Sequence, residues 1–333
     1  MTDLAVLVQP SANRVYARSG PALLAAELAA LDHLALGDRL GDIAVTELGG
    51  VPYVTCSGEL DDDVHAVLSN LSATYALFER DGDRLRPLTP TRLDRWDDDL
   101  VSIQRYPGRT NEQLTRLVLN LTLAAAAGTR PFTGERMRVL DPLCGRGTTL
   151  NVAVQLGFDA AGIDVDRKDV DAYLHFFTTW LKDKRAKHAT SRHGGRTTIT
   201  FAADKDAQKA GRGQEVVVVS ADTTTAVAHL GKASVDVVVA DLPYGVHHGS
   251  SSGDALRRSP VTLLRSALPV WRSVLRPGGA IGLAWNAKVL PRADVVGALD
   301  TAGFVAVTGE AFDRFAHRVD QAIDRDVVVA RRG

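Results

Sequence analysis

The stretch MRVLDPLCGRGTT, residues 137–149, decides the fold of this chain. A short apolar strand candidate runs directly into a turn that contains Gly145 and Gly147, and residues 148–157 then have helical spacing. The two glycines let the backbone turn tightly and approach a ligand closely. The turn lacks the Lys-Ser/Thr pair of a P-loop, and Leu150 occupies the third glycine position of a dinucleotide fingerprint. The stretch therefore predicts a ligand-binding strand–turn–helix unit and makes NAD-type enzymes the second choice.

Strand and helix candidates alternate from about residue 100 to the end of the chain. Those in the middle include the continuous Val-rich runs EVVVVSA (215–221) and VDVVVA (235–240). Such runs are typical of strands buried on both faces of a mainly parallel sheet. The alternation predicts a Rossmann-like, doubly wound α/β domain over residues 96–333, with one long helix over 167–187.

Residues 1–95 have a different pattern, which predicts a small α+β domain with a ferredoxin-like βαββαβ order. The expected elements are strands and helices at 4–10, 21–31, 43–48, 51–56, 61–71 and 73–80. Residues 84–99 are polar and contain Pro87 and Pro90, so we expect them to form the linker. The sequence leaves two roles open for this first domain, namely RNA binding and a purely structural cap.

Composition restricts the function classes. The chain has 333 residues and a net charge of −1, so it is no polycation and a nucleic-acid partner must bind to a local patch. Cys56 and Cys144 are too few for a disulfide framework and lack metal-ligand spacing. The first residues do not resemble a signal peptide, and the most apolar helical stretch, 21–36, is too short and too charged to span a bilayer. We therefore expect a cytoplasmic protein without a metal site or a membrane partner.

Polar residues follow the predicted parallel strands, and the carboxyl ends of such strands form the ligand-binding edge of a doubly wound sheet. The residues at these positions are Asp141, Asp164, Asp222 and Asp241. An Asp after a strand is often only a helix cap or a turn residue, and for a single Asp the two interpretations are about equal. Four in series, each beside a Gly-rich or Pro-containing turn, favour a ligand site. Asp164 is placed to accept hydrogen bonds from a ribose diol, and Asp222 from an adenine amino group.

Two motifs carry a resemblance to a known family. Residues 141–148 read Asp-Pro-x-Cys-Gly-x-Gly-Thr, and residues 241–245 read Asp-x-Pro-Tyr-Gly. Together they resemble the amino-group methyltransferases that act on nucleic-acid bases, above all the THUMP-type tRNA guanosine-N2 methyltransferase family and its bacterial relatives. The resemblance covers roughly residues 105–333 and includes Tyr106-Pro107-Gly108, where the family has a short motif that contacts the cofactor. Leu242 departs from the pattern, because many relatives have a second proline there.

The resemblance implies that S-adenosylmethionine is the cofactor. It also implies a set of cofactor-binding residues: Asp141, Cys144, Gly145, Gly147 and Thr148 around the methionine end, Asp164 at the ribose, Val165 and Asp222 at the adenine, and Asp241 beside them.

The chemistry of residues 241–244 suits an exocyclic amine, a weak nucleophile whose lone pair is delocalised into the base. The carboxylate of Asp241 and the backbone carbonyl of Leu242 or Pro243 are expected to accept the two N–H groups, which aims the lone pair at the methyl group and stabilises the growing positive charge. Tyr244 is expected to stack on the base, a contact worth about 1–3 kcal/mol. Trp285 and Asn286 are expected beside Asp241, where Asn286 would read a base edge or Trp285 would simply pack.

The resemblance makes tRNA or rRNA the expected partner, and a basic cluster at residues 182–196 would track its phosphates or form a solvated helix end. The first 95 residues have room for the ferredoxin-like piece of the tRNA enzymes but not for their THUMP module. Two alternatives to guanine N2 remain: adenine N6 or cytosine N4 in DNA or RNA, and a catalytically silent S-adenosylmethionine-binding RNA scaffold.

Overall fold

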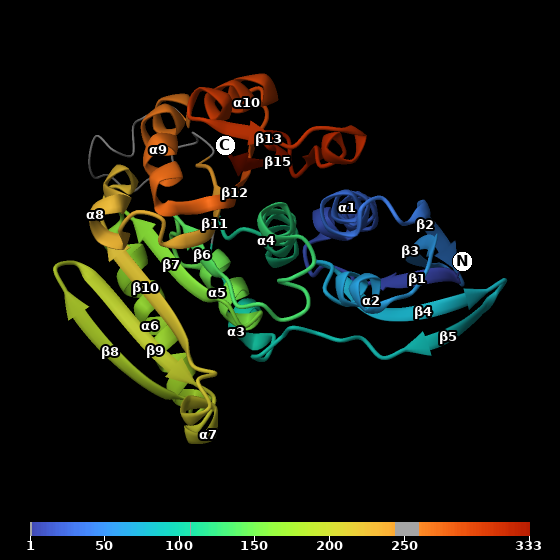
Figure 1. The fold of residues 1–333 in the computed structure, drawn as a ribbon, viewed down its shortest axis with the longest axis horizontal. Helices are drawn as coiled ribbons and strands as arrows, with labels where there is room; N and C mark the ends of the chain where they lie inside the picture. The colour runs from blue at the N-terminus through green and yellow to red at the C-terminus, as the bar shows by residue number, and fades with distance from the viewer. Residues whose placement is uncertain (1, 107, 244–259) are drawn as a thin grey trace.

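The computed structural model describes residues 2–106, 108–243 and 260–333 and contains two β-sheets with helices between them (Figure 1). The first sheet has the strand order β2-β3-β1-β4-β5 with antiparallel pairs throughout. Its elements are β1 (Thr2–Val8), α1 (Arg14–Leu31), β2 (Gly41–Leu48), β3 (Val51–Gly58), α2 (Asp62–Ser69), β4 (Thr74–Asp81) and β5 (Arg84–Leu88). The expected βαββαβ order is therefore confirmed, with β5 added at one edge.

Strand β5 corrects the prediction that residues 84–99 are all linker. The two-residue turn Gly82-Asp83 connects β4 to β5, and Gly82 has a φ of +61°. Gly-Asp between two strands is a hairpin signal that the charged, Pro-containing composition of this stretch obscured. Pro87 is tolerated because β5 is an edge strand, which leaves one side of its backbone unpaired.

The second sheet has the order β13-β15-β12-β11-β6-β7-β10-β9-β8, and β14 pairs with β15. Its central strands run parallel: β6 (Arg138–Asp141), β7 (Asp159–Asp164), β10 (Gln214–Ser220), β11 (Val235–Asp241) and β12 (Leu275–Asn286). The flanking strands make the antiparallel pairs: β8 (Lys187–His193), β9 (Arg196–Ala202), β13 (Phe304–Ala306), β14 (His317–Arg318) and β15 (Asp324–Arg332). The chain proceeds to one side from β6 and to the other from β11, so the switch point of this doubly wound sheet lies between these two strands.

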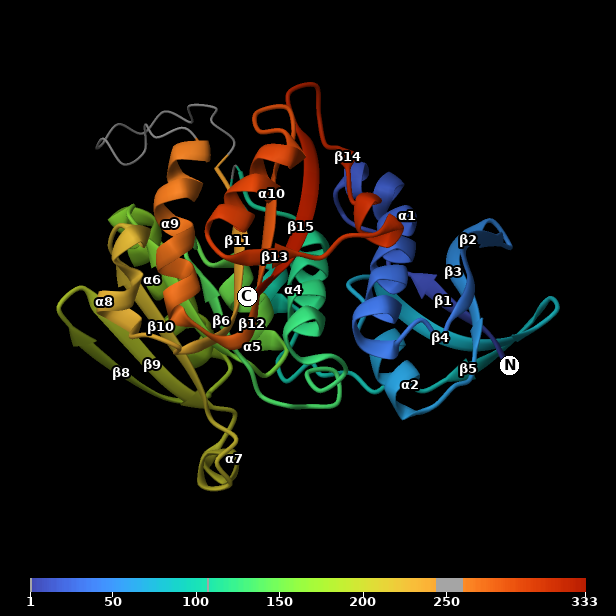
Figure 2. The same cartoon turned by 45° about the horizontal axis from the view of Figure 1, so that its top comes forward.

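Helices cover both faces of the second sheet (Figures 1 and 2). The helices described in this part of the chain are α3 (Asp99–Ser102), α4 (Glu112–Ala127), α5 (Thr148–Gln155), α6 (Arg167–Asp183), α7 (Lys205–Lys209), α8 (Ala226–Leu230), α9 (Pro260–Val274) and α10 (Arg292–Thr301), of which α7 lies at the tip of the β9–β10 connection. Successive strand residues point to opposite faces: Val139 packs in the core that holds α4, α5 and α6, and Leu140 packs in the core that holds α8, α9 and α10. The prediction of a Rossmann-like domain with strands buried on both faces is confirmed.

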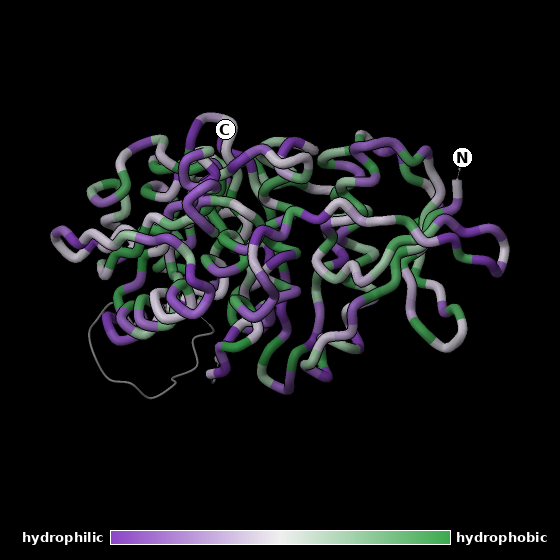
Figure 3. The backbone as a smooth tube through the Cα atoms, turned by 90° about the horizontal axis from the view of Figure 1, so that it is seen from below, coloured by the Kyte–Doolittle hydropathy of each residue, from purple (hydrophilic) through white to green (hydrophobic). Residues whose placement is uncertain are grey.

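The core on the α4 side continues into the first unit, where it includes residues of α1, α2 and the first sheet. The hydrophobic segments in Figure 3 accordingly run through the interior of both units. A polar network crosses the same boundary: the fully buried Glu27 of α1 accepts hydrogen bonds from the Ser72 backbone N (3.0 Å) and from Asn120 Nδ2 of α4 (2.8 Å). Burial raises the pKa of Glu27.

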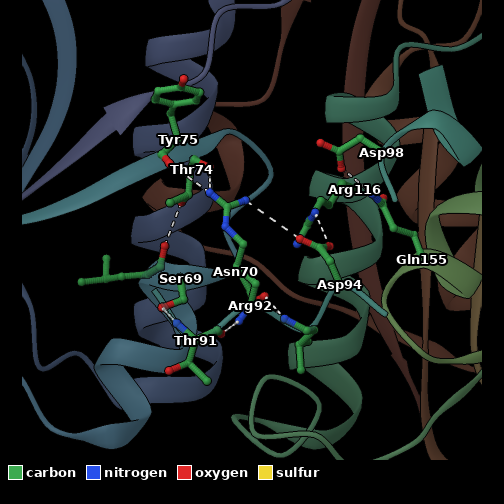
Figure 4. Close-up of polar contacts among 12 residues, drawn as sticks. Ser69, Asn70, Thr74, Tyr75, Thr91, Arg92, Asp94, Asp98, Arg116 and Gln155 are labelled. Atoms are coloured by element: carbon green, nitrogen blue, oxygen red, sulfur yellow. Dashed lines mark hydrogen bonds and ion pairs between the residues drawn. The ribbon is translucent and has the colours of Figure 1, made fainter. Parts of the chain in front are cut away.

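Residues 89–98, between β5 and α3, are tied to both units by polar contacts (Figure 4). Arg92 Nη2 donates to the Tyr75 carbonyl oxygen of β4 at 2.9 Å. Asp94 Oδ1 accepts from Arg116 Nη1 of α4 at 3.0 Å. The connection therefore fixes the first unit against α4 instead of acting as a free tether.

Helix α6 ends at Asp183, four residues before the expected end at 187, because Arg185 adopts a left-handed φ of +54° and residues 187–193 form β8. This ending divides the basic cluster. Lys184 forms ion pairs with Asp97 (2.6 Å) and Asp99 (2.5 Å), so it has a structural partner at that end of α6. The turn after β8 lies instead at the carboxyl end of β10, where Ser220 N donates to the Gly195 carbonyl oxygen. The 182–196 cluster is therefore not one continuous patch.

None of the helices in the described ranges is both long and apolar enough to cross a membrane.

Candidate active site

The carboxyl ends of β6, β7 and β11 bring Asp141, Asp164 and Asp241 to one edge of the sheet, as the sequence predicts. Burial raises the pKa of Asp141 to about 7, and the neighbouring charges of Asp164 and Asp241 act in the same direction. Burial also raises the pKa of Asp164. The edge therefore concentrates acidic groups in a poorly solvated place, which favours a ligand with positive charge.

The glycine turn between β6 and α5 is held in a fixed shape. Gly147 N donates to the Cys144 carbonyl oxygen at 2.7 Å, and Cys144 N donates to the Ile163 carbonyl oxygen at 3.0 Å. Gly145 and Gly147 have left-handed φ values of +47° and +80°. A Cβ on Gly147 would lie 2.3 Å from the Tyr173 ring, whereas a Cβ on Gly145 would meet no atom within 4 Å. Gly147 thus allows the Tyr173 ring to pack closely against the turn, whereas a side chain at Gly145 would project into open space.

Asp164 joins the glycine turn to the end of β7. Its Oδ2 accepts from Gly145 N at 2.7 Å, and its Oδ1 accepts from Asp166 N at 2.8 Å. The next side chain, Val165, is 46% exposed, which is unusual for an apolar residue beside a buried strand. A carboxylate next to an exposed apolar side chain fits the ribose and the adenine of a nucleoside. The open space at Gly145 continues this cradle.

Tyr106 lies against the same turn. Its hydroxyl is 3.1 Å from Thr148 Oγ1, and the guanidinium of Arg146 lies 5.0 Å from the centre of its ring. Tyr106 belongs to the motif that, by the resemblance, contacts the cofactor, and it therefore lies in contact with the glycine turn. Pro107 lies outside the described residues.

Asp222 follows β10 and caps the short 3₁₀ helix Thr223–Thr225. Its Oδ1 accepts from Thr224 N (2.9 Å) and from Thr224 Oγ1 (2.6 Å). This is the capping role that the sequence left open for such an Asp. A contact with adenine stays a prediction.

Two side chains among the described residues hydrogen-bond to the carboxylate of Asp241, and the sequence did not reveal either of them. Arg325 of β15 donates to both of its oxygens at 3.1 Å, and Thr110 Oγ1 donates to Oδ2 at 2.5 Å. The Arg325 side chain is only 5% exposed, and that of Asp241 is 24% exposed. The pairing of Asn286 with Arg325 across β12 and β15 places the guanidinium there. Thr110 is 131 residues and Arg325 is 84 residues from Asp241 in the chain, so no local sequence pattern predicts these contacts.

The residues after Asp241 are only partly described. Leu242 is 1% exposed and its backbone N donates to the Ala284 carbonyl oxygen at 2.8 Å, which continues the β11–β12 pairing by one residue. Pro243 is exposed. Tyr244, the expected stacking residue, lies outside the described residues.

Trp285 and Asn286 come just past Ala284, which pairs with Asp241, but both have structural roles. Trp285 is 1% exposed, and its Nε1 donates to the Leu290 carbonyl oxygen at 2.8 Å. The Asn286 side chain donates to the Ala322 carbonyl oxygen (3.0 Å) and accepts from the backbone N of Asp324 (3.1 Å). The interpretation of Trp285 as a packing residue is confirmed. The idea that Asn286 reads a base edge was wrong, because backbone groups occupy its amide.

Across the described residues, we find no group of three or more His, Cys, Asp or Glu side chains arranged to hold a metal ion.

The chain is similar to a methyltransferase family and to several solved structures. The family model described as RMKL-like, methyltransferase domain, matches residues 111–288. Among solved structures, TrmN from Thermus thermophilus is similar at 15% identity and a TM-score of 0.46, with 100% of both chains covered. A TehB-like S-adenosylmethionine-dependent methyltransferase from Corynebacterium glutamicum is similar at 16% identity and a TM-score of 0.34, with 63% of this chain and 92% of that chain covered. A putative rRNA methylase from Clostridium thermocellum has 16% identity and a TM-score of 0.35, over 59% of this chain and 89% of that chain.

These structural scores are low, so the assignment rests on the family model and on the topology and edge of the second sheet. A comparison with curated proteins gives no significant match. The chain belongs to the RMKL-like methyltransferase domain family and is a methyltransferase that uses S-adenosylmethionine.

Proposed function

We propose that this enzyme methylates an exocyclic amino group of a nucleic-acid base, and that its substrate is guanine N2 in tRNA or another RNA. The observation that carries the proposal is the environment of Asp241. Its carboxylate ends the strand beside the switch point and is oriented by Arg325 and Thr110. Leu242 and Pro243 follow with backbone carbonyls and no competing side-chain chemistry.

The site suits an amine nucleophile because it fixes an acceptor before the substrate arrives. S-adenosylmethionine supplies an already activated methyl group, so the protein has to position and desolvate the amine. Asp241 would accept an N–H of the amine and stabilise the positive charge that grows on nitrogen as its lone pair bonds to the methyl carbon and the bond from that carbon to sulfur breaks. S-adenosylhomocysteine would be the leaving group. The amine then releases one proton to solvent. Because Arg325 and Thr110 hold the carboxylate, little reorganisation is required in the transition state.

For the cofactor we propose the residues of the cradle described above. The methionine end would lie against the glycine turn, with Asp141, Cys144, Gly145, Gly147 and Thr148 around it. The ribose would lie at Asp164, and the adenine between Val165 and Asp222. The open space at Gly145 and the exposed side chain of Val165 support this arrangement.

We predict that Asp164→Ala weakens S-adenosylmethionine binding by about tenfold or more. A hydrogen bond to a charged acceptor is worth about 1.5–3 kcal/mol, and the carboxylate also holds the Gly145 backbone in place. Isothermal calorimetry measures the affinity, with Asp166→Ala as a control that removes a neighbouring acid. Unchanged affinity in Asp164→Ala would exclude this residue from the ribose site.

The raised pKa of Asp141 predicts a pH-dependent affinity. With a pKa of about 7 in the cofactor-free protein, Asp141 is largely neutral below that pH. The sulfonium and ammonium groups of S-adenosylmethionine favour the ionised carboxylate, so binding must also remove the proton. The affinity should therefore be full above pH 7 and fall by up to about tenfold per unit as the pH drops below it.

The measurement is calorimetry with wild type and Asp141→Asn between pH 5.5 and 8.5. The Asn variant should bind more weakly at pH 8 and show a flatter profile, because it has no proton to lose. A flat profile in wild type would contradict the role of Asp141.

Nucleoside mass spectrometry of total RNA and DNA from a deletion strain tests the function itself. Loss of N2-methylguanosine from RNA, restored by the wild-type gene but not by an Asp241→Asn gene, is the expected result. Loss of N6-methyladenine or N4-methylcytosine instead would identify the alternative base. An unchanged profile, together with tight cofactor binding, would favour the non-catalytic scaffold.

A further inference from the structure

A cavity of about 480 Å³ lies between the first unit and the methyltransferase domain. Asn13 and Tyr16 of the first unit line one side, and Arg105, Thr110 and Arg325 line the other. We call it the interface pocket. Its volume is within the range of natural small-ligand sites.

The interface pocket adjoins the proposed catalytic carboxylate. Thr110 and Arg325 line the pocket and also hydrogen-bond to Asp241. A ligand in the pocket would therefore contact two side chains that hold the carboxylate. This is close enough for one substrate molecule to reach both places.

The Tyr16 hydroxyl makes no hydrogen bond among the described residues. The Tyr16 side chain lines the pocket although the residue is only 4% exposed, and its ring packs edge-on against His317 with centroids 5.4 Å apart. Nothing within the described residues hydrogen-bonds to its hydroxyl. Burial raises the pKa of Tyr16 to about 12, so the hydroxyl keeps its proton and is a donor at neutral pH. A nearly buried donor on the wall of a cavity indicates a ligand that accepts a hydrogen bond.

The charges around the pocket favour an anionic ligand. Asp241 balances Arg325, and Glu112 forms an ion pair with Arg109 at 3.2 Å. Arg105 is exposed and has no acidic partner in the described part of the chain. Among the described residues that line the pocket, Arg105 therefore adds a positive charge without an acidic partner, and Tyr16 adds a hydrogen-bond donor.

We propose that the interface pocket binds a phosphodiester group of the RNA strand next to the target nucleotide, with Arg105 supplying the charge and Tyr16 donating a hydrogen bond. This inference rests on the proposed function and makes the first unit part of the substrate site. A purely structural cap would not require the Tyr16 hydroxyl and the Arg105 guanidinium, both without a partner among the described residues, to line the same cavity. Phosphate contacts position a nucleic acid without reading its sequence, which suits a pocket beside the base site.

The test measures the binding of a fluorescein-labelled single-stranded oligoribonucleotide by anisotropy at several salt concentrations. Arg105→Gln should weaken binding about tenfold and lower the slope of log affinity against log salt by about 0.7, the value for one lost single-strand phosphate contact. Tyr16→Phe removes one oxygen and should weaken binding up to tenfold with little change in slope. Arg84→Gln and Tyr75→Phe are matched controls, because both residues are exposed on the first sheet away from the pocket.

S-adenosylmethionine affinity and thermal unfolding of each variant verify that the fold and the cofactor site are intact. If Arg105→Gln and Tyr16→Phe bind the oligoribonucleotide as wild type does, with the same slope, the pocket proposal is overturned even if the enzyme methylates RNA.

A second probe separates this proposal from the proposed function. Saturation-transfer NMR compares guanosine 5′-monophosphate with guanosine. A preference for the monophosphate in wild type that Arg105→Gln abolishes supports a nucleotide-phosphate pocket, whether or not RNA is methylated. Equal binding of both compounds to wild type counts against the pocket.

Discussion

Asp241→Asn is expected to lower the single-turnover rate of methyl transfer by about 10²–10³, the usual cost of removing one preorganised electrostatic contact in a transition state. The affinity for S-adenosylmethionine should stay within a few fold. The amide keeps an oxygen that can accept from Arg325 and Thr110, so the local geometry survives while the negative charge is lost. The assay is transfer of labelled methyl groups to RNA from a strain that lacks the gene.

The structure shows why Asp241→Ala is the poorer variant. Both variants remove the negative charge beside Arg325, whose side chain is 5% exposed, but alanine also removes the oxygen that accepts its hydrogen bonds, whereas asparagine keeps one. Loss of one partner of a buried pair typically costs about 3–5 kcal/mol of stability, so inactivity would not separate a chemical role from unfolding.

The double variant Asp241→Ala/Arg325→Met removes both charges together and is the matched control. It should be more stable than Asp241→Ala and equally inactive. Wild-type rates in Asp241→Asn or in the double variant would refute the mechanism.

The fold and the acidic edge of the site followed from local patterns. The Val-rich runs that become β10 and β11 can be buried only between two layers of helices, and a parallel sheet brings the ends of its strands to one edge. The positions of Asp141, Asp164 and Asp241 at that edge are therefore consequences of strand periodicity. The glycines between β6 and α5 are equally local, because their φ values are required within the turn itself.

The partners of these residues depend on tertiary structure and had no local signal. Arg325 reaches Asp241 only because β15 lies beside β12, and Tyr16 lines the same pocket as Arg325 only because α1 packs on α4. Asn286 occupies the predicted place but makes hydrogen bonds with the backbone of Ala322 and Asp324, where β15 begins. The local sequence predicts which strand position a side chain occupies. Its hydrogen-bond partners come from segments that are distant in the chain, so the local sequence does not predict them.

The two glycines of the turn should respond differently to alanine. Gly147→Ala should lower the free energy of unfolding by about 2–5 kcal/mol and abolish measurable cofactor binding. Its φ of +80° costs an alanine about 1–2 kcal/mol. Its Cβ would also lie 2.3 Å from the ring of the fully buried Tyr173, and such overpacking costs about 1–3 kcal/mol more.

Gly145→Ala is the matched comparison, because Gly145 also has a positive φ, +47°, but its Cβ would meet no atom within 4 Å. Only the backbone cost of about 1–2 kcal/mol applies, so the variant should stay folded while its methyl group projects into the space proposed for the methionine end of S-adenosylmethionine. Chemical denaturation measures the stability difference, and calorimetry measures the loss of cofactor affinity, expected to be at least tenfold. If Gly145→Ala bound the cofactor as wild type does, the open space at Gly145 would not be the cofactor site, and the cradle would have to lie elsewhere along the edge. If both variants were equally unstable, the Tyr173 contact would not be what distinguishes the two glycines.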